Sequence, residues 1–346
     1  MTALALLNYL LCLALGKDSA LTDMPTAQMW RHTFMLAKKH NVVAIAWDGL
    51  LILQQHTPQA FSTLSQQLLG QWFADTHAIE SVNRGRVKQI ERVQDDLLKQ
   101  GFSSIVLKGS SLAKFYPEPL HRQSSDIDLW LLSTASYHAQ RTAIIDYLRS
   151  ANIGIEEVVY HHIVTNYFPS AEVELHVTPT WLCSPWRNRR LQEAFRQEGS
   201  RLLNGEHTMS ASMMELYMIV HAFRHIYHDG LSLRHMLDYY LVRENNRRNS
   251  VPAPSSLLRD IGLATFASAM DEVTNYLFGG VSAYPQSLLS QHLLSAIRNG
   301  KYPLMYKLID YPIETLCNPL WRVVHRWWRI TNHYLSICEK PVSSDI

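Results

Sequence analysis

The spacing of apolar residues changes near residue 103 and changes back near residue 179, and this double change limits what the chain can fold into. Up to Gln100, apolar residues recur three and four positions apart, which predicts helices. Between residues 103 and 177, short runs alternate apolar and polar side chains, which predicts β-strands. After Pro179 the helical spacing returns and continues to near Cys338. The pattern indicates an α+β protein.

The alternating region divides further into short elements. Helix 86–100 precedes it, and Gly101 stands where a C-terminal glycine ends a helix. Strands are predicted at 103–107, 126–132, 155–168 and 172–177, and helices at 112–116 and 135–149. We therefore expect a mixed-sheet core at 86–180, an N-terminal helical part at 1–85 and a C-terminal helical part at 181–346.

Composition excludes several classes of protein. The chain has 346 residues, of which 47% are hydrophobic and 18% charged, so it can bury a core and is not a disordered chain. Its net charge of +2 lacks the basic excess of a non-specific nucleic-acid binder. The apolar stretch at 3–15 has no Lys or Arg before it, so we interpret it as a buried helix and not as a signal peptide. No run reaches the ~18 apolar residues of a membrane span, and we expect a cytoplasmic protein.

A turn at Lys108-Gly109-Ser110-Ser111 joins a predicted strand to a predicted helix. Such a turn gathers backbone N–H groups at the positive end of a helix, which suits a phosphate. Gly-Ser turns are common, so this turn alone is weak evidence for a ligand. Lys108, and Arg122 further along, would add positive charge at the phosphates. A structural ion pair is the alternative for each.

Two carboxylates follow in Asp126-Ile127-Asp128, on a predicted strand. Side chains alternate across a strand, so both carboxylates share one face while Ile127 points into the core. Two carboxylates so close repel each other unless they are solvated or share a cation. We expect both to face solvent. Their position downstream of the Gly-Ser turn favours a cation site over a plain solvated strand end.

A third carboxylate is available on the strand at 172–177. Glu172, Glu174 and His176 share one face of it, and Glu174 lies deeper in the apolar run. If this strand pairs with that of Asp126, Glu174 joins the same site, with Glu172 as the alternative. Three oxygen donors suit Mg²⁺ or Mn²⁺ better than zinc. His176 either orients Glu174 or simply packs.

These features together resemble a known family. The residues that carry the resemblance are Lys108-Gly109-Ser110, Tyr116-Pro117, Arg122, Asp126-Ile127-Asp128, Glu174-Leu175-His176, His221 to His225, Leu233-Arg234 and Asp238-Tyr239. The chain resembles the uncharacterised bacterial nucleotidyltransferases of the polymerase-β-like superfamily over most of its length. The spacer between Ser110 and Asp126 is slightly long and contains Pro117 and Pro119, a departure that concerns the loop and not the metal site.

The resemblance implies a metal-dependent transfer of an NMP from an NTP to an acceptor hydroxyl or phosphate. It implies that Asp126 and Asp128 hold two Mg²⁺ or Mn²⁺ ions and that Glu174 completes the acceptor-side ion. Residues implied to bind the nucleotide are Lys108, Gly109, Ser110, Ser111 and Arg122. Residues with a possible substrate-side role are His176, His225, Arg234 and Asp238.

The acceptor is open: a small molecule or a sugar, with RNA or protein as the alternatives. Two other functions also stay open, namely a catalytically silent nucleotide- or partner-binding module and a toxin–antitoxin-type enzyme that modifies RNA or protein. The presence of Asp126, Asp128 and Glu174 argues against the catalytically silent module, because a site that has lost its activity usually loses an acidic residue first.

Three further signals have ordinary structural explanations. His221 and His225, four apart, could bind zinc, but helix-packed histidines usually form hydrogen bonds. Arg234 and Asp238, also four apart, could form an ion pair within one helix. The Trp and Arg residues at 321–329 suit either a packed aromatic face or an anionic partner. The four cysteines lie far apart at 12, 183, 317 and 338, so we expect reduced thiols.

Overall fold

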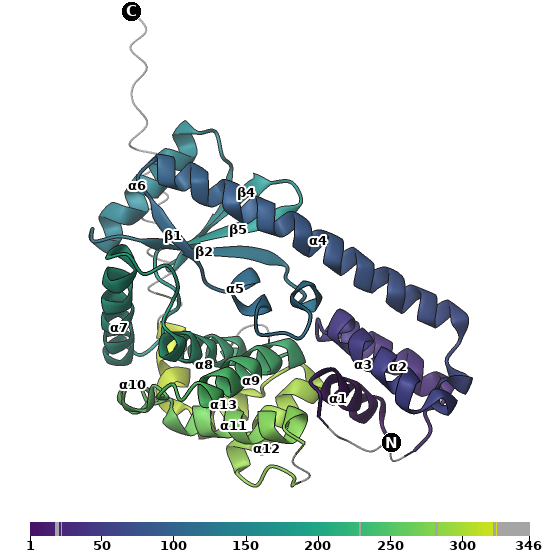
Figure 1. Cartoon of the computed structure of the whole chain (residues 1–346). Helices are drawn as coiled ribbons and strands as arrows, with labels where there is room; N and C mark the ends of the chain where they lie inside the picture. Colours follow the sequence, from purple (N-terminus) through teal and green to yellow (C-terminus); the bar gives the residue numbers. More distant parts are fainter. Residues whose placement is uncertain (18–20, 22, 228–229, 281–282, 321–322, 324–346) are drawn as a thin grey trace, which may run out of the picture.

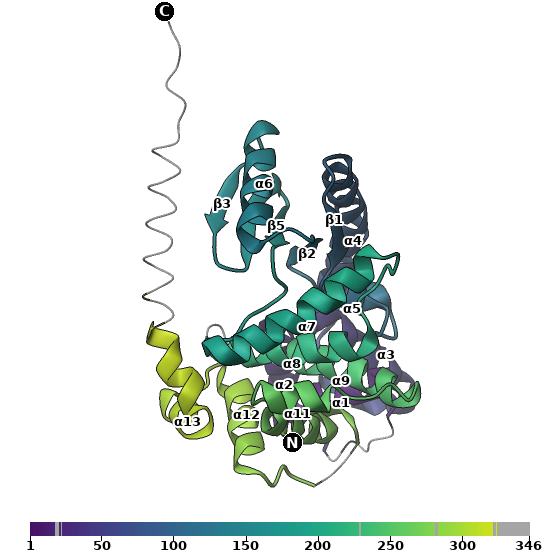
Figure 2. The ribbon, with the colours of Figure 1, turned by 90° about the vertical axis from the view of Figure 1, so that its left-hand side faces the viewer.

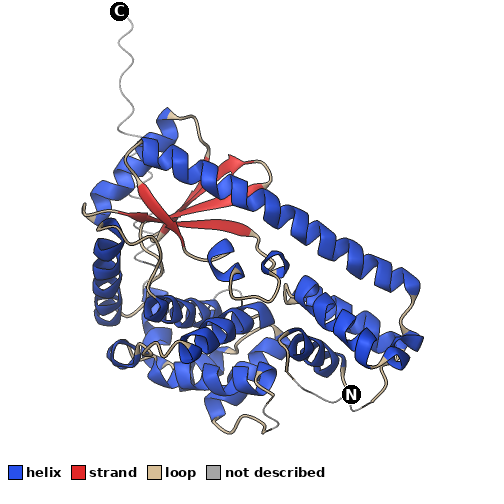
Figure 3. Cartoon of the chain, viewed as in Figure 1, coloured by secondary structure: helices blue, strands red, loops and turns tan. Residues whose placement is uncertain are grey.

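The structure, a computed structural model, describes residues 1–17, 21, 23–227, 230–280, 283–320 and 323. It confirms the α+β fold, in which one five-stranded sheet lies among many helices (Figure 3). Among the described residues, no helix combines the length and the apolar character needed to cross a bilayer. The Trp and Arg segment at 321–329 lies outside the described residues except for position 323, and Cys338 lies outside them as well.

The helices account for most of the described chain. In order they are α1 (Ala3–Ala14), α2 (Ala27–Lys39), α3 (Val43–His56), the 3₁₀ turn η1 (Pro58–Thr63), α4 (Gln66–Lys99), α5 (Ser110–Ala113), the 3₁₀ turn η2 (Pro119–His121), α6 (Tyr137–Ser150), α7 (Pro185–Leu203), α8 (Ala211–Tyr227), α9 (Leu233–Arg248), α10 (Ser255–Asp260), α11 (Ala264–Phe278), α12 (Leu288–Asn299) and α13 (Leu304–Asp310). Side-chain caps start several of them: Ser65 caps α4 and Ser136 caps α6 by accepting a backbone N–H.

The sheet has the strand order β1-β2-β5-β4-β3. Its strands are β1 (Ser103–Val106), β2 (Asp126–Leu132), β3 (Ile155–Val158), β4 (His162–Phe168) and β5 (Ala171–His176). The β2–β5 pair is parallel and the other pairs are antiparallel. This mixed pairing matches the mixed sheet predicted from the alternating runs.

Two local predictions were wrong. The single strand predicted at 155–168 is a hairpin of β3 and β4, and its turn at 159–161 contains none of the Gly, Pro, Asn or Asp residues that usually signal one. The helix predicted at 112–116 is a single turn, α5, that begins at Ser110 and ends at Ala113. Pro117 and Pro119 follow closely and leave no room for a longer helix.

One face of the sheet is apolar. Ile127 and Leu129 of β2 lie beside Val173 and Leu175 of β5, and all four are buried. They pack against apolar residues of α4 and α6, which include Val93 and Leu148. Figure 1 shows α4 running along this side of the sheet, while α8 and α9 lie on the other side. Alternation therefore turns the opposite residues of the same strands, including Asp128 and Glu174, toward the C-terminal helices.

The N-terminal and C-terminal helices share one hydrophobic core (Figure 2). Leu6 and Leu10 of α1 belong to the same cluster as Phe266 and Phe278 of α11. The Cys12 thiol donates to the carbonyl oxygen of Leu277 at 3.3 Å. The N-terminal stretch is thus a buried helix, as predicted. Among the described cysteines, none forms a disulfide.

Helix α4 bears on the proposed division of the chain. It runs without a break from Gln66 to Lys99, so it crosses the predicted boundary at residue 85. Its later turns pack on the sheet, while Leu68 and Trp72 of its first turns belong to the core of the helical parts. The division into 1–85, 86–180 and 181–346 stays a prediction.

Candidate active site

The parallel pairing of β2 with β5 brings the predicted acidic residues together. Asp126 lies opposite Glu172, and Asp128 lies opposite Glu174. The candidate ligand atoms of Asp128, Glu174 and His176 all lie within 4.8 Å of one another. Glu172 is exposed, whereas Glu174 is partly buried inside this group. The geometry favours Glu174 over Glu172 as the third carboxylate.

Lys108 lies between the two aspartates. Its ammonium nitrogen is 2.9 Å from Oδ2 of Asp126 and 3.1 Å from Oδ1 of Asp128. Burial alone would lower the pKa of Lys108, but the negative charges of Asp128 and Asp126 outweigh it and hold the pKa well above its ordinary value. The ammonium therefore offsets part of the negative charge of the pair. The ion pair that was the alternative for Lys108 is present, and its role at the phosphates stays a prediction.

His176 lies between the second and third carboxylates. Its Nε2 donates to Oδ1 of Asp128 at 3.2 Å and to Oε2 of Glu174 at 3.1 Å. Burial would lower the pKa of His176, but these two hydrogen bonds outweigh it and raise the pKa to about 9. Both the orienting and the packing explanations of His176 hold, because the ring is 4% exposed and fixes Glu174.

Asp128 differs from the expectation in its burial. Its side chain has no exposed surface, whereas Asp126 keeps 18%. Burial raises the pKa of Asp128 even though Lys108 opposes the shift. Its Oδ2 is buried and has no hydrogen-bond partner among the described residues. The expectation that both aspartates face solvent was wrong for Asp128, because Lys108 and His176 lie against its carboxylate and the strand pattern alone cannot show that.

The Gly109 turn has a backbone that favours glycine. Its φ is +74°, and a Cβ at this position would lie 3.2 Å from Oγ of Ser124. The turn leads into α5, which has four residues, so the helix adds little positive field at this point. The Oγ of Ser111 is buried and has no partner within the described chain. Phosphate binding by Gly109, Ser110 and Ser111 stays a prediction.

Arg122 is held in a buried ion pair with Asp238 of α9. Its Nε and Nη2 donate to the two carboxylate oxygens at 2.9 and 2.8 Å. The hydroxyl of Tyr116 donates to the same carboxylate at 2.8 Å. The structural alternative for Arg122 is therefore present. The expected pairing of Asp238 with Arg234 is replaced by this pair, and Nη1 of Arg234 donates to the carbonyl of Gln123 at 3.3 Å.

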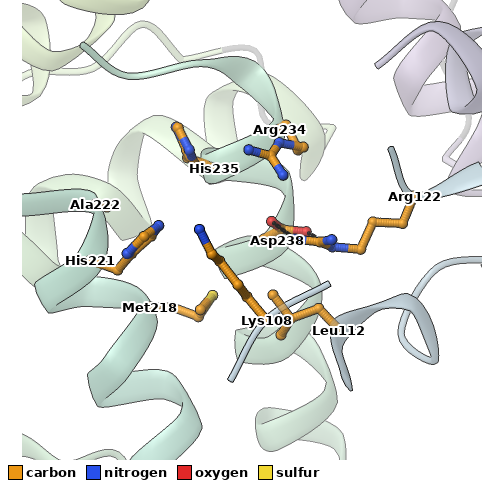
Figure 4. Close-up of a pocket in the computed structure, with 9 residues that line it drawn as sticks. All are labelled: Lys108, Leu112, Arg122, Met218, His221, Ala222, Arg234, His235 and Asp238. Carbon is orange, nitrogen blue, oxygen red and sulfur yellow. Dashed lines mark hydrogen bonds and ion pairs between the residues drawn. The ribbon is translucent and has the colours of Figure 1, made fainter. Parts of the chain in front are cut away.

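A pocket opens beside this ion pair (Figure 4). Its volume of about 10 Å³ leaves room for about one water molecule. The lining residues are Lys108, Leu112, Arg122, Met218, His221, Ala222, Arg234, His235 and Asp238. Three of them are cations with fixed charge, and the one carboxylate, that of Asp238, is already paired with Arg122. Nη1 of Arg122 and Nε of Arg234 are buried and lack partners within the described chain. The lining suits an anion.

Three histidines gather at the same helices. Nε2 of His225 lies 3.0 Å from Nε2 of His221, and the ring of His225 stacks on that of His235 at 4.1 Å. Burial holds the pKa values of His221 and His235 well below the ordinary value, so both rings are neutral. The structure thus places Arg234 in the same pocket lining as Lys108, and His225 beside His221 and His235 of that lining. Their substrate-side role stays a prediction.

Comparison with known proteins decides the family. A profile described as an uncharacterised nucleotidyltransferase matches residues 26–279. The chain belongs to this nucleotidyltransferase family. The match begins at the N-cap of α2 and ends just after α11, so it includes the sheet, the acidic group and the pocket. No curated protein and no solved structure matches the chain.

Membership of the nucleotidyltransferase family supports a transferase activity with an NTP as substrate. It confirms the family suggested by the sequence motifs. The family profile does not specify the acceptor, the metal or the role of any residue.

Sequence reasoning missed several residues around the nucleotidyltransferase site. His162 of β4 lies opposite His176 of β5, and its Nδ1 is 3.4 Å from Oε2 of Glu174. Burial lowers the pKa of His162 to about 3, so its ring is neutral. Arg86 of α4 donates to the carbonyl of Ser125 at 2.7 Å, next to Asp126. Dividing the run at 155–168 into a hairpin would have placed His162 beside His176.

Proposed function

We propose that this chain transfers an NMP from an NTP to an acceptor hydroxyl or phosphate in a reaction that requires divalent metal ions. The observation that carries the proposal is the group of Asp126, Asp128 and Glu174. These three carboxylates from two parallel strands converge on a largely buried spot within a nucleotidyltransferase family domain. Buried carboxylates at close range destabilise a fold unless cations accompany them, so such a group indicates a functional site.

The residues present fit a pair of divalent ions. Oδ2 of Asp128 is buried and has no partner among the described residues, as expected of an oxygen that binds a metal ion. Lys108 lies between Asp126 and Asp128, and His176 lies between Asp128 and Glu174. A positively charged side chain therefore lies at each of the two proposed ion positions. Asp126, Asp128 and Glu174 would hold Mg²⁺ or Mn²⁺. When bound, such ions neutralise the triphosphate and favour the ionised acceptor oxygen.

The protein's own residues would bind and orient the nucleotide. The N–H groups and hydroxyls of the turn at 109–111 would bind the β- and γ-phosphates, and Lys108 would turn from the aspartates toward them. Arg234 and the remaining Nη1 of Arg122 would contribute positive charge from the pocket. Asp238 would act by holding Arg122 in place, since both of its oxygens already accept from that guanidinium.

The acceptor would approach from the Glu174 side, where His176 fixes the carboxylate. His225, beside the pocket, is a further candidate for contact with the acceptor. A small molecule or a sugar remains the proposed acceptor, with RNA or protein as alternatives, and the cytoplasm remains the proposed location.

One observation favours the silent binding module instead. The Lys108 ammonium already forms ion pairs with both Asp126 and Asp128, as expected of a site that works without metal ions. The proposal therefore requires that an NTP with its metal ions displaces the Lys108 ammonium, and activity measurements decide between the two functions.

The test is incubation of the full-length chain with each α-labelled NTP, Mg²⁺ or Mn²⁺, and a cell extract as the source of acceptor. We expect label to become attached to one class of acceptor, and Asp128→Asn to reduce the rate at least about 100-fold. Equal labelling by the variant would show that the transfer does not use this site. Metal-dependent NTP binding without transfer under either metal would establish the silent module.

A further inference from the structure

The Glu174 end of the acidic group contains nitrogen ligands as well as oxygen ligands. His162 of β4 and His176 of β5 lie directly opposite each other in the antiparallel register. Nδ1 of His162 is 3.4 Å from Oε2 of Glu174, which is 3.1 Å from Nε2 of His176. That nitrogen is in turn 3.2 Å from Oδ1 of Asp128. Two imidazoles and two carboxylates thus form a continuous set.

These separations match those of atoms bound to one metal ion. Metal–ligand bonds of about 2.0–2.2 Å place neighbouring ligand atoms roughly 3.0–3.5 Å apart in tetrahedral or octahedral geometry. The three consecutive separations of 3.4, 3.1 and 3.2 Å fall inside this range. The ligand atoms of Asp128, Glu174 and His176 already lie within 4.8 Å of one another, and His162 would complete the set from the neighbouring strand.

We propose that this end of the site binds a first-row transition dication, of the Zn²⁺, Fe²⁺, Co²⁺ or Mn²⁺ class, through His162, Glu174, His176 and Asp128. This inference rests on the proposed function, because the ion would be the acceptor-side ion of that reaction. Binding releases the proton that His176 Nε2 donates to the carboxylates. The two ion positions would then differ in kind: Asp126 and Asp128 offer oxygen alone and suit Mg²⁺, whereas imidazole ligands select a transition metal.

The other histidine group of the described chain provides an internal comparison. His221, His225 and His235 also have candidate ligand atoms within 4.8 Å, but no carboxylate belongs to that group. Arg234 lies in the adjoining pocket, and its charge opposes a dication there. Variants of these histidines are therefore matched controls.

The test uses the full-length chain, stripped of metal by a chelator and free of nucleotide. Zn²⁺ and Mg²⁺ are titrated separately by calorimetry, and Mn²⁺ bound to the wild type is examined by pulsed EPR for coupling to imidazole nitrogen. We expect one Zn²⁺ per chain with an affinity on the order of 100-fold above that of Mg²⁺, and nitrogen coupling in the Mn²⁺ spectrum. His162→Gln should lower Zn²⁺ affinity at least about 10-fold.

Controls separate the possible outcomes. His221→Gln and His138→Gln, the latter at an exposed position of α6, should leave Zn²⁺ affinity unchanged. Loss of Zn²⁺ binding in His221→Gln with retention in His162→Gln would overturn the assignment. So would equal affinities for Zn²⁺ and Mg²⁺, or a Mn²⁺ spectrum without nitrogen coupling. If His162→Gln does not fold, as its melting curve would reveal, the wild-type spectrum decides by itself.

Mg²⁺-dependent NTP binding is measured in parallel. If it persists while transition-metal selectivity is absent, this inference fails and the proposed function stands. If NTP binding does not depend on any divalent ion, the proposed function fails, whatever the Zn²⁺ titration gives.

Discussion

The two faces of the sheet are built from the same strands and differ in almost every physical property. On one face, Ile127 and Leu129 are buried among apolar residues of α4 and α6. On the other, Asp128 and Glu174 are largely buried among Lys108 and two histidines. The first face stabilises the fold through apolar burial.

The second face carries charges whose burial costs free energy, offset by ion pairs. Adjacent residues of β2 therefore lie in different environments, one on the apolar face and the next on the charged face. The difference indicates that the apolar face maintains the structure and that the charged face is maintained for chemistry. Substitutions of neighbouring residues can therefore separate stability from activity.

The largest expected effect is on the charged face. Glu174→Gln should reduce turnover about 10³-fold while NTP affinity changes no more than a few-fold, because Glu174 would act on the acceptor side and not on the triphosphate. Glu172→Gln, on the same strand but exposed, is the matched control and should retain near wild-type turnover. Initial rates and calorimetry measure the two quantities. Normal turnover in Glu174→Gln would move the third carboxylate to Glu172.

On the apolar face we expect the reverse: a substitution should lower stability and leave turnover nearly unchanged. Leu129→Ala removes a fully buried side chain, and we expect the free energy of unfolding to fall by about 2–5 kcal/mol. Turnover per folded molecule should stay within a few-fold of the wild type. Leu98→Ala, at a 63% exposed position of α4, is the control and should change stability little. Urea denaturation measures both variants, and a large activity loss in folded Leu129→Ala would mean that the faces are not separable.

Lys108→Met tests whether the Lys108 ammonium stabilises the carboxylates of the charged face when no metal ion is bound. The substitution leaves Asp126 and Asp128 without their ammonium, so metal-free protein should melt about 2–5 °C lower than the wild type. Millimolar Mg²⁺ should recover most of this loss and should shift the wild type less, because Lys108 no longer competes. Lys114→Met, at an exposed position, controls for loss of one charge. An equal Mg²⁺ shift in all three proteins would contradict the displacement of Lys108.

The smallest effect concerns a histidine between two carboxylates away from the sheet. His121 lies 2.8 Å from Asp48 and 3.0 Å from Glu80. Burial would lower its pKa, but the hydrogen bonds to Asp48 and Glu80 outweigh it and raise the pKa. A raised pKa stabilises the fold at low pH, and that stabilisation is lost as pH rises through the folded-state value.

His121→Gln should therefore cost on the order of 1 kcal/mol near pH 6 and less near pH 8. Denaturation of the wild type and the variant at both pH values measures the difference. A cost that is the same at both values would mean that the charge on His121 does not contribute.

Much of the sheet could be predicted from the sequence. The alternation in 126–132 and 172–177 fixes which side chains share a face, and both runs are strands in the structure. The association of Asp128 with Glu174 required one further assumption, that the two strands are neighbours. Sequence motifs supplied it through the family resemblance and not through periodicity.

The burial of Asp128 and the position of His162 could not be predicted. Both depend on side chains from other elements: Lys108 and His176 lie against Asp128, and a hairpin without a turn signal places His162 beside His176. Periodicity reports which side of an element is apolar, but it does not report what packs against the polar side. The same limit applies to Arg122, whose partner Asp238 lies 116 positions away.

The core shared by α1 and α11 has a consequence for how the chain is made. Cys12 and Leu277, in contact across this core, are separated by 265 positions. Ribosomes emit the N-terminus first, at about 5–20 residues per second, so α1 can pack on α2 and α3 early but waits on the order of tens of seconds for α11. During that interval the part of α1 that packs on α11 remains without its final partner. We expect nascent chains that stop before α11 to bind chaperones through this first helix, and the sheet to fold before the helical core that surrounds it.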